Sequence, residues 1–379
     1  MKKILLGTTA LVSAGLIAGP ALASDPLAVT VGGTVTAGFY VIDADDIGAT
    51  SFTDTAVKLV ARNIDIKAEG TLDNGMVAGV IATLSLGDDW NTAATTVGGN
   101  LVGGNNNDAV FRELFAYLEG GFGRFEIGGT DGAAFKMHYT SPWFVPGNGV
   151  DSPNILNTLT AASAFRHSTF SLMAADSNKV TYFTPRFAGF QLGGSYTPET
   201  SFNGPNPNGL GLLPNTAVNI GDVFEIALNY AGSFGGVDVG ADAFYVSGES
   251  GPTAADPEEL GFGLNLGMAG FTLGGAWYQS EDLLVASVPV PSAAGVEEEV
   301  WTVGLSYGTG PWTVGVAYLT DEISSPGFSA EIESWQAGGG YNLGSGVDVG
   351  VDVQMSTINI GGGADIDSTS AGLVLSIGF

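Results

Sequence analysis

Residues 347–355 of the chain, VDVGVDVQM, alternate strictly between apolar and other side chains. Successive side chains of an extended strand point to opposite faces, so this stretch has one apolar face. That face is formed by Val347, Val349, Val351, Val353 and Met355. Asp348 and Asp352 share the opposite face with a glycine and a glutamine. The pattern predicts a β-strand that separates an apolar from a polar environment.

The same alternation recurs throughout the chain, with clear copies at residues 190–197, 224–230, 237–245 and 260–266. Short Gly- and Asn-rich turns, typical of hairpins, separate many of these segments. They lie at 73–75, 120–122, 187–189, 235–236, 268–270, 309–311 and 344–346. Longer polar connections alternate with them, at 43–55, 88–107, 131–178, 199–221, 248–257, 282–296, 322–330 and 357–366. About sixteen strands result, an even number that suits a closed up-and-down barrel.

Short turns on one side and long connections on the other are typical of outer-membrane barrels. A bilayer tolerates no unpaired backbone groups, so only helices and closed barrels span it. Aromatic residues fall near the ends of the apolar faces, as interfacial girdles require: Tyr230, Trp301, Tyr307, Trp312, Tyr318 and Tyr341. The predicted fold class is all-β, a 16-stranded antiparallel transmembrane β-barrel.

Composition excludes several other classes. The formal net charge of −28 argues against nucleic acid as a partner, because phosphate binding requires a basic surface. A hydrophobic fraction of 45% argues against disorder. Without cysteine the chain has neither a disulfide framework nor a thiol nucleophile. A closed hydrogen-bonded sheet is therefore a candidate source of stability.

Both ends of the chain carry export and assembly features. Residues 1–23 have a basic start, a short apolar run and a small-residue cleavage site, which predicts an export signal and a mature barrel at 24–379. Loss of Lys2 and Lys3 would leave nine basic against 39 acidic residues, a formal charge of −30. The final strand alternates up to Phe379 and resembles the C-terminal signature by which the barrel-assembly machinery recognises outer-membrane proteins.

Two internal segments carry a family resemblance. Residues 179–198, KVTYFTPRFAGFQLGGSYTP, resemble a signature segment of Gram-negative general porins, especially the α-proteobacterial branch. RELFAYL at 112–118 and GRFEIG at 123–128 are similar to that family's fourth and fifth strands. The resemblance implies a homotrimeric channel whose third outer loop folds inward and narrows the pore. Residues 131–178 occupy the position of that constriction loop.

The charges divide along the chain. All nine basic residues of the predicted mature protein precede position 187, whereas polar-face acids continue through the later strands. In a closed barrel the two sets would line different arcs of the lumen and create a transverse field. The predicted pore and constriction residues are Lys67, Arg112, Arg124, Glu126, Asp131, Lys136, His138, Asp151, Arg166, His167, Lys179, Asp238, Asp242, Asp348 and Asp352.

The predicted constriction loop departs from the family pattern. Porins place acids on this loop, but residues 142–147, PWFVPG, contain none. Trp143, Phe144 and the prolines are expected to hold the loop against the wall, while Arg166 and His167 face the water. With the acidity of the whole chain, we expect a weakly cation-preferring pore.

Many of the remaining acids fall in predicted outer loops, among them Asp321 and Glu322. Carboxylate groups are suitable ligands for Ca²⁺. A structural Ca²⁺ that bridges to lipopolysaccharide is a further hypothesis, although solvated loop charge is the favoured interpretation at any one site. No other cofactor is expected. The candidate ligands are Asp43, Asp45, Asp46, Asp88 and Asp89.

The leading hypothesis is an outer-membrane porin, a passive water-filled diffusion channel for small hydrophilic solutes and ions. A substrate-selective porin with a solute site on the loop is the nearest alternative. A secreted acidic β-rich surface protein would require a short fixed repeat along its strands. A lipid hydrolase would require a catalytic role for His167, and both histidines lie within one loop. We therefore expect no enzymatic activity.

Overall fold

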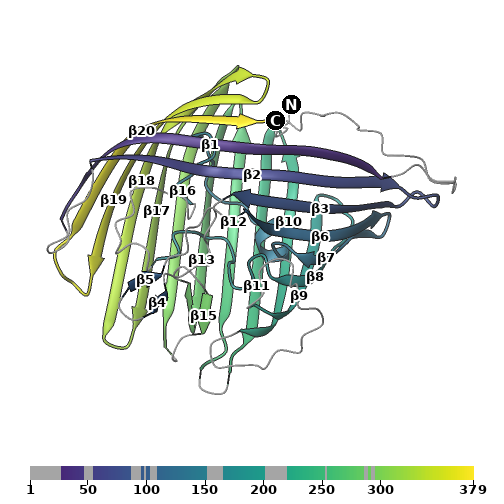
Figure 1. Cartoon of the computed structure of the whole chain (residues 1–379), viewed down its shortest axis with the longest axis horizontal. Coiled ribbons are helices and arrows are strands. Elements are labelled where there is room, and N and C mark those ends of the chain that lie inside the picture. The colour runs from purple at the N-terminus through teal and green to yellow at the C-terminus, as the bar shows by residue number, and fades with distance from the viewer. Residues whose placement is uncertain are drawn as a thin grey trace.

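The computed structural model describes residues 27–46, 54–86, 95–97, 100–102, 109–151, 165–200, 220–251, 254–285, 289–291 and 295–379. Within this part of the chain, sixteen strands close into one antiparallel barrel (Figure 1). Each barrel strand pairs with its neighbours along the chain, and the first strand pairs with the last. The predicted fold class is confirmed. The predicted export signal, residues 1–23, lies outside the described residues.

The barrel strands are β1 (Ala28–Ala44), β2 (Thr55–Thr71), β3 (Val77–Leu86), β6 (Ala109–Gly120), β7 (Gly123–Gly129), β8 (Asn178–Phe183), β9 (Phe190–Glu199), β10 (Gly221–Phe234), β11 (Val237–Glu249), β12 (Glu258–Met268), β13 (Phe271–Glu281), β16 (Glu297–Thr309), β17 (Trp312–Ser325), β18 (Phe328–Gly344), β19 (Val347–Ile360) and β20 (Ile366–Gly378). Their alternation and their short turns match the sequence prediction, but several strands extend beyond it into the predicted outer loops. Extra ladder hydrogen bonds continue the pairing there, since each paired residue satisfies its backbone groups.

Two of the predicted loops contain small hairpins outside the barrel. The hairpins are β4 (Thr95–Val97) with β5 (Asn100–Val102), and β14 (Leu283–Val285) with β15 (Pro289–Pro291). A single helical turn, α1 (Ala133–Lys136), follows β7. Among the described residues, no helix is long and apolar enough to cross a bilayer.

Closure of the barrel joins the two ends of the described chain. β1 pairs with β20 from Thr34 opposite Gly378 to Ala44 opposite Ser368, and the purple and yellow strands lie side by side in Figure 1. Phe379 extends this contact, because its backbone N–H donates to the carbonyl of Gly33 at 3.0 Å. Closure leaves the barrel sheet without an unpaired edge.

The two faces of the barrel wall are opposite in character to those of a water-soluble protein. On β20, Leu373, Leu375 and Ile377 point outward and are exposed, whereas Ser370 and Ser376 point inward and are buried. An apolar outer face with a polar inner face is the arrangement of a barrel surrounded by lipid. Cross-strand aromatic pairs such as Trp312 with Tyr341, 4.5 Å between ring centroids, lie near the short turns.

Candidate functional site

The longest connection between neighbouring barrel strands joins β7 to β8. The sequence predicts that this segment is functional. The structure describes two parts of it, which we name the first limb (residues 131–151) and the second limb (residues 165–177). Residues 152–164 lie outside the described residues. Both limbs make their hydrogen bonds to the polar face of the strands, opposite the exposed apolar face.

The first limb begins at α1, whose free N–H groups are satisfied by the barrel wall. The backbone N–H of Ala133 donates to the Ser195 hydroxyl at 2.8 Å, and that of Ala134 donates to the Glu225 carboxylate at 3.0 Å. The side-chain amide of Asn229 donates to the carbonyl of Met137 at 2.8 Å. Helix ends leave such groups unpaired, so these contacts fix the start of the limb to β9 and β10.

Beyond α1 the first limb lies in a groove made by glycines on the inner face. At each of these positions a Cβ atom would press against the limb, from Met137 and Tyr139 at one end to Pro146 at the other. Glycine inside a strand marks places where another backbone approaches closely. We name this set the glycine groove: Gly193, Gly240, Gly263, Gly274, Gly304, Gly315, Gly338, Gly340 and Gly350.

The glycine groove orders the limb against the strands. Tyr139 meets β11 and β12, Phe144 lies over Gly315 of β17, and Pro146 lies over Gly350 of β19. The prediction that Phe144 and the prolines hold the segment against the wall is thus confirmed. It is wrong for Trp143, which is 46% exposed and packs over Gly149 of its own limb.

The far end of the first limb is held by Asp352. Its carboxylate accepts hydrogen bonds from Asn148 of the limb at 3.0 Å, from the Tyr40 hydroxyl at 3.1 Å, and from Gln336 and Gln354. Asp352 is fully buried. Its predicted place on the polar face is right, but its expected exposure to the lumen is wrong, because the limb and four donors enclose it.

A buried hydrogen-bond network joins the two limbs. Asp151 accepts hydrogen bonds from Thr140 of the first limb and from Thr169 of the second. His138 connects Thr169 to the wall, with Nδ1 2.9 Å from Asp242 and Nε2 3.0 Å from the Thr169 hydroxyl. The order Thr, His, Asp is that of a catalytic triad. Here all three side chains are enclosed and the hydroxyl also bonds to Asp151, so the network fastens the limbs to β11.

The second limb carries Arg166 and His167, which were predicted to face the water. Arg166 is only 2% exposed and His167 only 3%. The guanidinium of Arg166 lies 3.5 Å from the centroid of the Tyr278 ring, contacts Glu259 at 3.4 Å, and donates to the Ser168 carbonyl at 2.7 Å. The prediction that these two residues face the water is wrong, because later strands supply buried acids that face them.

His167 is neutral in this setting. Burial lowers the pKa of its imidazole to about 4, against the opposing influence of the Asp151 carboxylate. Its backbone N–H donates to Asp321 at 2.8 Å, whereas neither imidazole nitrogen has a hydrogen-bond partner among the described residues. Asp321 was expected in an outer loop, but it lies buried in β17. Pairing with β16 extends β17 into the predicted outer loop at 322–330.

Lys179, predicted on the strand that follows the loop, is also buried. Its ammonium group donates to the carbonyls of Ser177 at 3.0 Å, Thr130 and Ala175. Lys179 lies on the polar face of β8 as predicted, yet it closes the base of the segment and is almost excluded from the lumen water. An ammonium group with several carbonyl acceptors is well satisfied when buried.

Arg112 reaches the same region through a β-bulge. Regular alternation would place it with Leu114 on the apolar face, but the β3–β6 register shifts so that Arg112 is the extra residue between Phe111 and Glu113. A bulge redirects a side chain. The guanidinium lies 3.5 Å from Glu113 and 3.8 Å from Asp176. Arg112 therefore lies on the inner face as predicted, but a β-bulge places it there.

The water-exposed cations of the inner wall lie on β2, β7 and α1. Lys67, whose side chain is 42% exposed, pairs with Glu69 at 2.7 Å. Glu126 is buried and accepts from Arg124 and from Lys136, each at 2.6 Å. The contacts of Glu126 place three predicted pore residues, Arg124, Glu126 and Lys136, in one mixed-charge group on the basic arc.

The predicted acids of the later strands β11 and β19, which we name the acidic arc, differ in exposure. Asp238 is exposed and Asp348 is half-buried, with Asn342 donating to it at 2.7 Å. Asp242 is buried and accepts the backbone N–H of Tyr139 at 2.7 Å. The separation of charges is only partial, because Glu69 and Glu126 lie among the cations of the early strands. Asp242 anchors the first limb and does not face open water.

A cavity of about 400 Å³ lies beside the basic arc, near the short turns that join β6 to β7 and β8 to β9. Three cations line it, Arg124, Lys136 and Arg186, together with the apolar Met137 and Phe183. Arg186 donates to Gln191 at 2.9 Å and to Asn229 at 2.7 Å. Glu119 also lines the cavity, and Arg124 and Lys136 are paired with carboxylates, so the cavity combines charged groups of both signs with apolar surface.

The predicted loop calcium ligands are only partly described. Asp43, Asp45 and Asp46 lie at the end of β1, where Asp45 accepts the backbone N–H of Asp367 at 3.0 Å. Asp88 and Asp89 lie outside the described residues. In the described part of the chain, a different set of three acids brings its carboxylates close together: Glu113, Asp131 and Asp176.

Sequence analysis missed several of the residues that hold the segment. The glycine groove was visible only as glycine on polar faces, since no pattern tells which glycine meets another chain segment. Glu113 was not predicted as a site residue, although it lies on the inner face with the buried Phe115 and Tyr117. Glu298 was not singled out, although its carboxylate accepts the backbone N–H of Arg166 at 3.3 Å.

Comparison with known proteins supports this architecture. Residues 7–360 match the family described as Gram-negative porin. No curated protein sequence matches the chain. Among solved structures, OmpF of Salmonella typhi in complex with daunomycin gives a TM-score of 0.61 at 14% identity, covering 93% of this chain and 98% of that chain.

Two further solved structures show the same fold. The outer membrane channel DcaP of Acinetobacter baumannii gives a TM-score of 0.59 at 12% identity, covering 93% of this chain and 98% of that one. The trimer form of Vibrio cholerae OmpT gives a TM-score of 0.57 at 13% identity, covering 94% and 100%. At these identities the likeness concerns the fold.

Proposed function

The chain belongs to the Gram-negative porin family, an outer-membrane β-barrel family, and on that basis we propose that it forms a passive, water-filled diffusion channel for small hydrophilic solutes and ions. The observation that carries the proposal is the polar inner face of the closed barrel together with the segment fastened across it. An apolar outer face suits lipid, whereas charges such as Lys67 and Asp238 require water inside.

The segment sets the bore of this channel. Its first limb follows the glycine groove from β9 to β19, and its second limb is bonded to β12, β16 and β17. Side chains that lie along the inner wall reduce the space left for solutes, and a narrow aqueous pore selects by diameter and by the groups that line it. Residues 131–178 therefore act as the constriction loop.

Swelling of vesicles that contain the purified protein tests this function. Neutral sugars of increasing size should enter at rates that fall smoothly with size, without saturation, because passage is diffusive. A rate that saturates with the concentration of one sugar would contradict a general diffusion channel. Protein that shows barrel mobility on a gel but no swelling with any sugar would overturn the channel itself.

A weak preference for cations is the second part of the proposal. Arg166, His167 and Lys179 are withdrawn from water, so they contribute less positive charge to the lumen than their number suggests. The exposed Asp238 and half-buried Asp348 stay on the acidic arc. Reversal potentials in a salt gradient should therefore have the sign of modest cation selectivity. A clear anion preference would contradict it.

The cavity beside the basic arc favours a second candidate, a substrate-selective porin. A small carboxylate with an apolar body would match Arg124 and Arg186 beside Phe183. Ligand pockets combine apolar lining with a few placed charges. Aliphatic monocarboxylates should then block the channel current at concentrations where neutral amides of the same length do not. Equal block by both would remove this candidate.

We also infer a homotrimer that contacts outer-membrane lipid and lipopolysaccharide and is inserted by the barrel-assembly machinery through Phe379. Support comes from the trimer form of the Vibrio cholerae protein of similar fold and from the outward apolar face. Chemical cross-linking of the detergent-extracted protein should end at trimers. A limit at dimers would contradict this assembly. No catalytic role is assigned, and a Ca²⁺ site at Asp43, Asp45 and Asp46 stays a prediction.

A further inference from the structure

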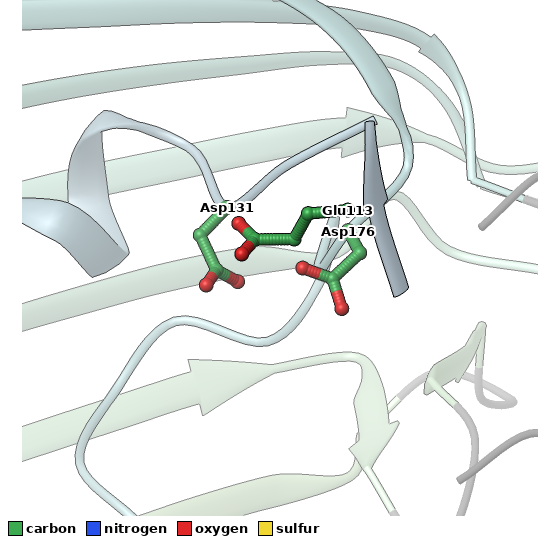
Figure 2. Close-up of side chains that lie close together, drawn as sticks. All are labelled: Glu113, Asp131 and Asp176. Carbon is green, nitrogen blue, oxygen red and sulfur yellow. The ribbon is translucent and has the colours of Figure 1, made fainter. Parts of the chain in front are cut away.

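Three carboxylates meet where the segment joins the barrel. Glu113 comes from β6, Asp131 is the second residue after β7, and Asp176 lies two residues before β8. Each offers an oxygen within 4.8 Å of the oxygens of the other two. Figure 2 shows the three side chains converging from separate strands and loops. The group therefore links both ends of the segment to the neighbouring strand.

Part of this group is fixed and part is unsatisfied. Glu113 is held in place, since it accepts from the Thr130 hydroxyl at 2.7 Å and from the Thr83 hydroxyl at 3.4 Å. Asp131 is nine-tenths buried, and among the described residues no hydrogen bond or ion pair reaches its carboxylate. One buried oxygen of Asp176, Oδ1, also has no hydrogen-bond partner there. Buried acceptors normally have a partner, so Oδ1 of Asp176 requires one.

Nearby protein cations do not complete the group. The Arg112 guanidinium approaches Glu113 and Asp176 at 3.5 and 3.8 Å, which is at or beyond the limit of a good hydrogen bond. The Lys179 ammonium donates to backbone carbonyls around the site. The group therefore brings three carboxyl groups together around the Arg112 and Lys179 side chains.

We propose that Glu113, Asp131 and Asp176 bind one hard divalent cation, Ca²⁺, which ties both ends of the segment to β6. Carboxylate oxygens are hard ligands, and no sulfur or imidazole is present to favour a softer metal. Ca²⁺ accepts irregular shells of 6–8 oxygens, whereas Mg²⁺ demands a near-ideal octahedron. Water and nearby carbonyl groups complete such a shell.

The proposal differs from the predicted calcium ligands in the outer loops. It uses acids at the base of the segment, and it gives the ion a structural role beside the channel. Because a cation bound only by the folded protein stabilises it, Ca²⁺ should raise the thermal midpoint of the barrel.

Calorimetric titration of CaCl₂ into the full, chelator-stripped protein in detergent and 150 mM NaCl tests this site. Wild type should bind Ca²⁺ at one site per chain, and Asp176→Asn and Asp131→Asn should each weaken that binding. Mutation of residues that merely support metal ligands costs about 10–100-fold in affinity, so loss of a ligand should cost at least about tenfold. Asp348→Asn, a matched change on an inner-face acid outside the group, should leave the affinity unchanged.

Folding of each variant is verified by its heat-modifiable gel mobility, and Glu113→Gln provides an independent variant if one aspartate variant fails to fold. A Ca²⁺-dependent rise in thermal midpoint that the Asn variants lack supports the site. Equal affinity and equal thermal response in wild type and the variants overturn it. Absence of Ca²⁺ binding by folded wild type overturns it as well.

Discussion

Replacement of Arg166 by methionine is the perturbation that addresses the segment most sharply. Methionine retains much of the length of the side chain but removes the guanidinium that packs on Tyr278 and contacts Glu259. Both partners of the ion pair are fully buried at their side chains. The substitution therefore leaves the Glu259 carboxylate without its cation, and it leaves the carbonyls of Ser168 and Phe170 without their donor.

The magnitude follows from that burial. Removal of one partner of a buried ion pair costs about 3–5 kcal/mol, because the remaining charge stays uncompensated in a medium of low polarity. A cost of this size raises the population of an undocked second limb by roughly 100- to 4,000-fold. The first limb should stay in place, because α1 is bonded to Ser195 and Glu225 and does not depend on Arg166.

Two assays measure the consequence. Equilibrium unfolding in lipid vesicles, followed by tryptophan fluorescence, should give Arg166→Met a free energy of unfolding about 3–5 kcal/mol below wild type. Single-channel recordings should show larger current fluctuations, since the second limb leaves the wall intermittently. Glu259→Gln in the same background should recover part of the loss, because it removes the unpaired charge.

Arg186→Met is the matched control. Arg186 is exposed near a short turn and makes its hydrogen bonds outside the segment, so its loss should cost no more than about 1 kcal/mol. A loss below 1 kcal/mol for Arg166→Met, with a quiet current like that of wild type, would refute the reasoning that this residue fastens the limb to the wall.

Two further predictions concern the groove and the base of the segment. Gly263→Ala places a Cβ against the Tyr139 carbonyl, so it should destabilise the barrel by about 1–3 kcal/mol and alter single-channel conductance. Gly267→Ala on the same strand is the control: its nearest atom lies at 3.6 Å, so neither the stability nor the conductance should change. Equal effects of the two substitutions would contradict the packing of the limb in the glycine groove. Because the pKa of Asp176 is raised from 3.8 to about 8, its protonated form is favoured in the folded chain, and stability in chelator should fall as pH rises across that interval. Thermal midpoints should show this slope in wild type and a flatter one in Asp176→Asn, and identical slopes would refute it.

The barrel could be predicted from the sequence because the patterns that indicate it are local. Alternation such as that of residues 347–355 depends on the two-residue period of a strand, and each short turn carries its own glycine or asparagine. Closure of the barrel follows because a membrane does not tolerate a sheet edge with unpaired backbone groups. Strand ends were less predictable, as Asp321 shows, because additional ladder pairs depend on the neighbouring strand.

The site was less predictable because it is assembled by contacts between distant residues. Alternation places Lys179 on the polar face, but it does not tell that backbone carbonyls of Thr130 and Ser177 surround its ammonium group. Arg166 was expected in water, since its buried partner Glu259 is far away in sequence. Arg112 depends on a bulge, which shifts the register without any mark in the local pattern.

The most direct test of the central claim is the conductance of the purified protein in a planar bilayer. The account predicts ohmic, stepwise current increases in groups of three equal levels, because each chain of a trimer is its own water-filled channel. Protein with the gel mobility of a folded barrel that inserts without any stepwise conductance would contradict the claim that residues 131–178 leave an open aqueous path.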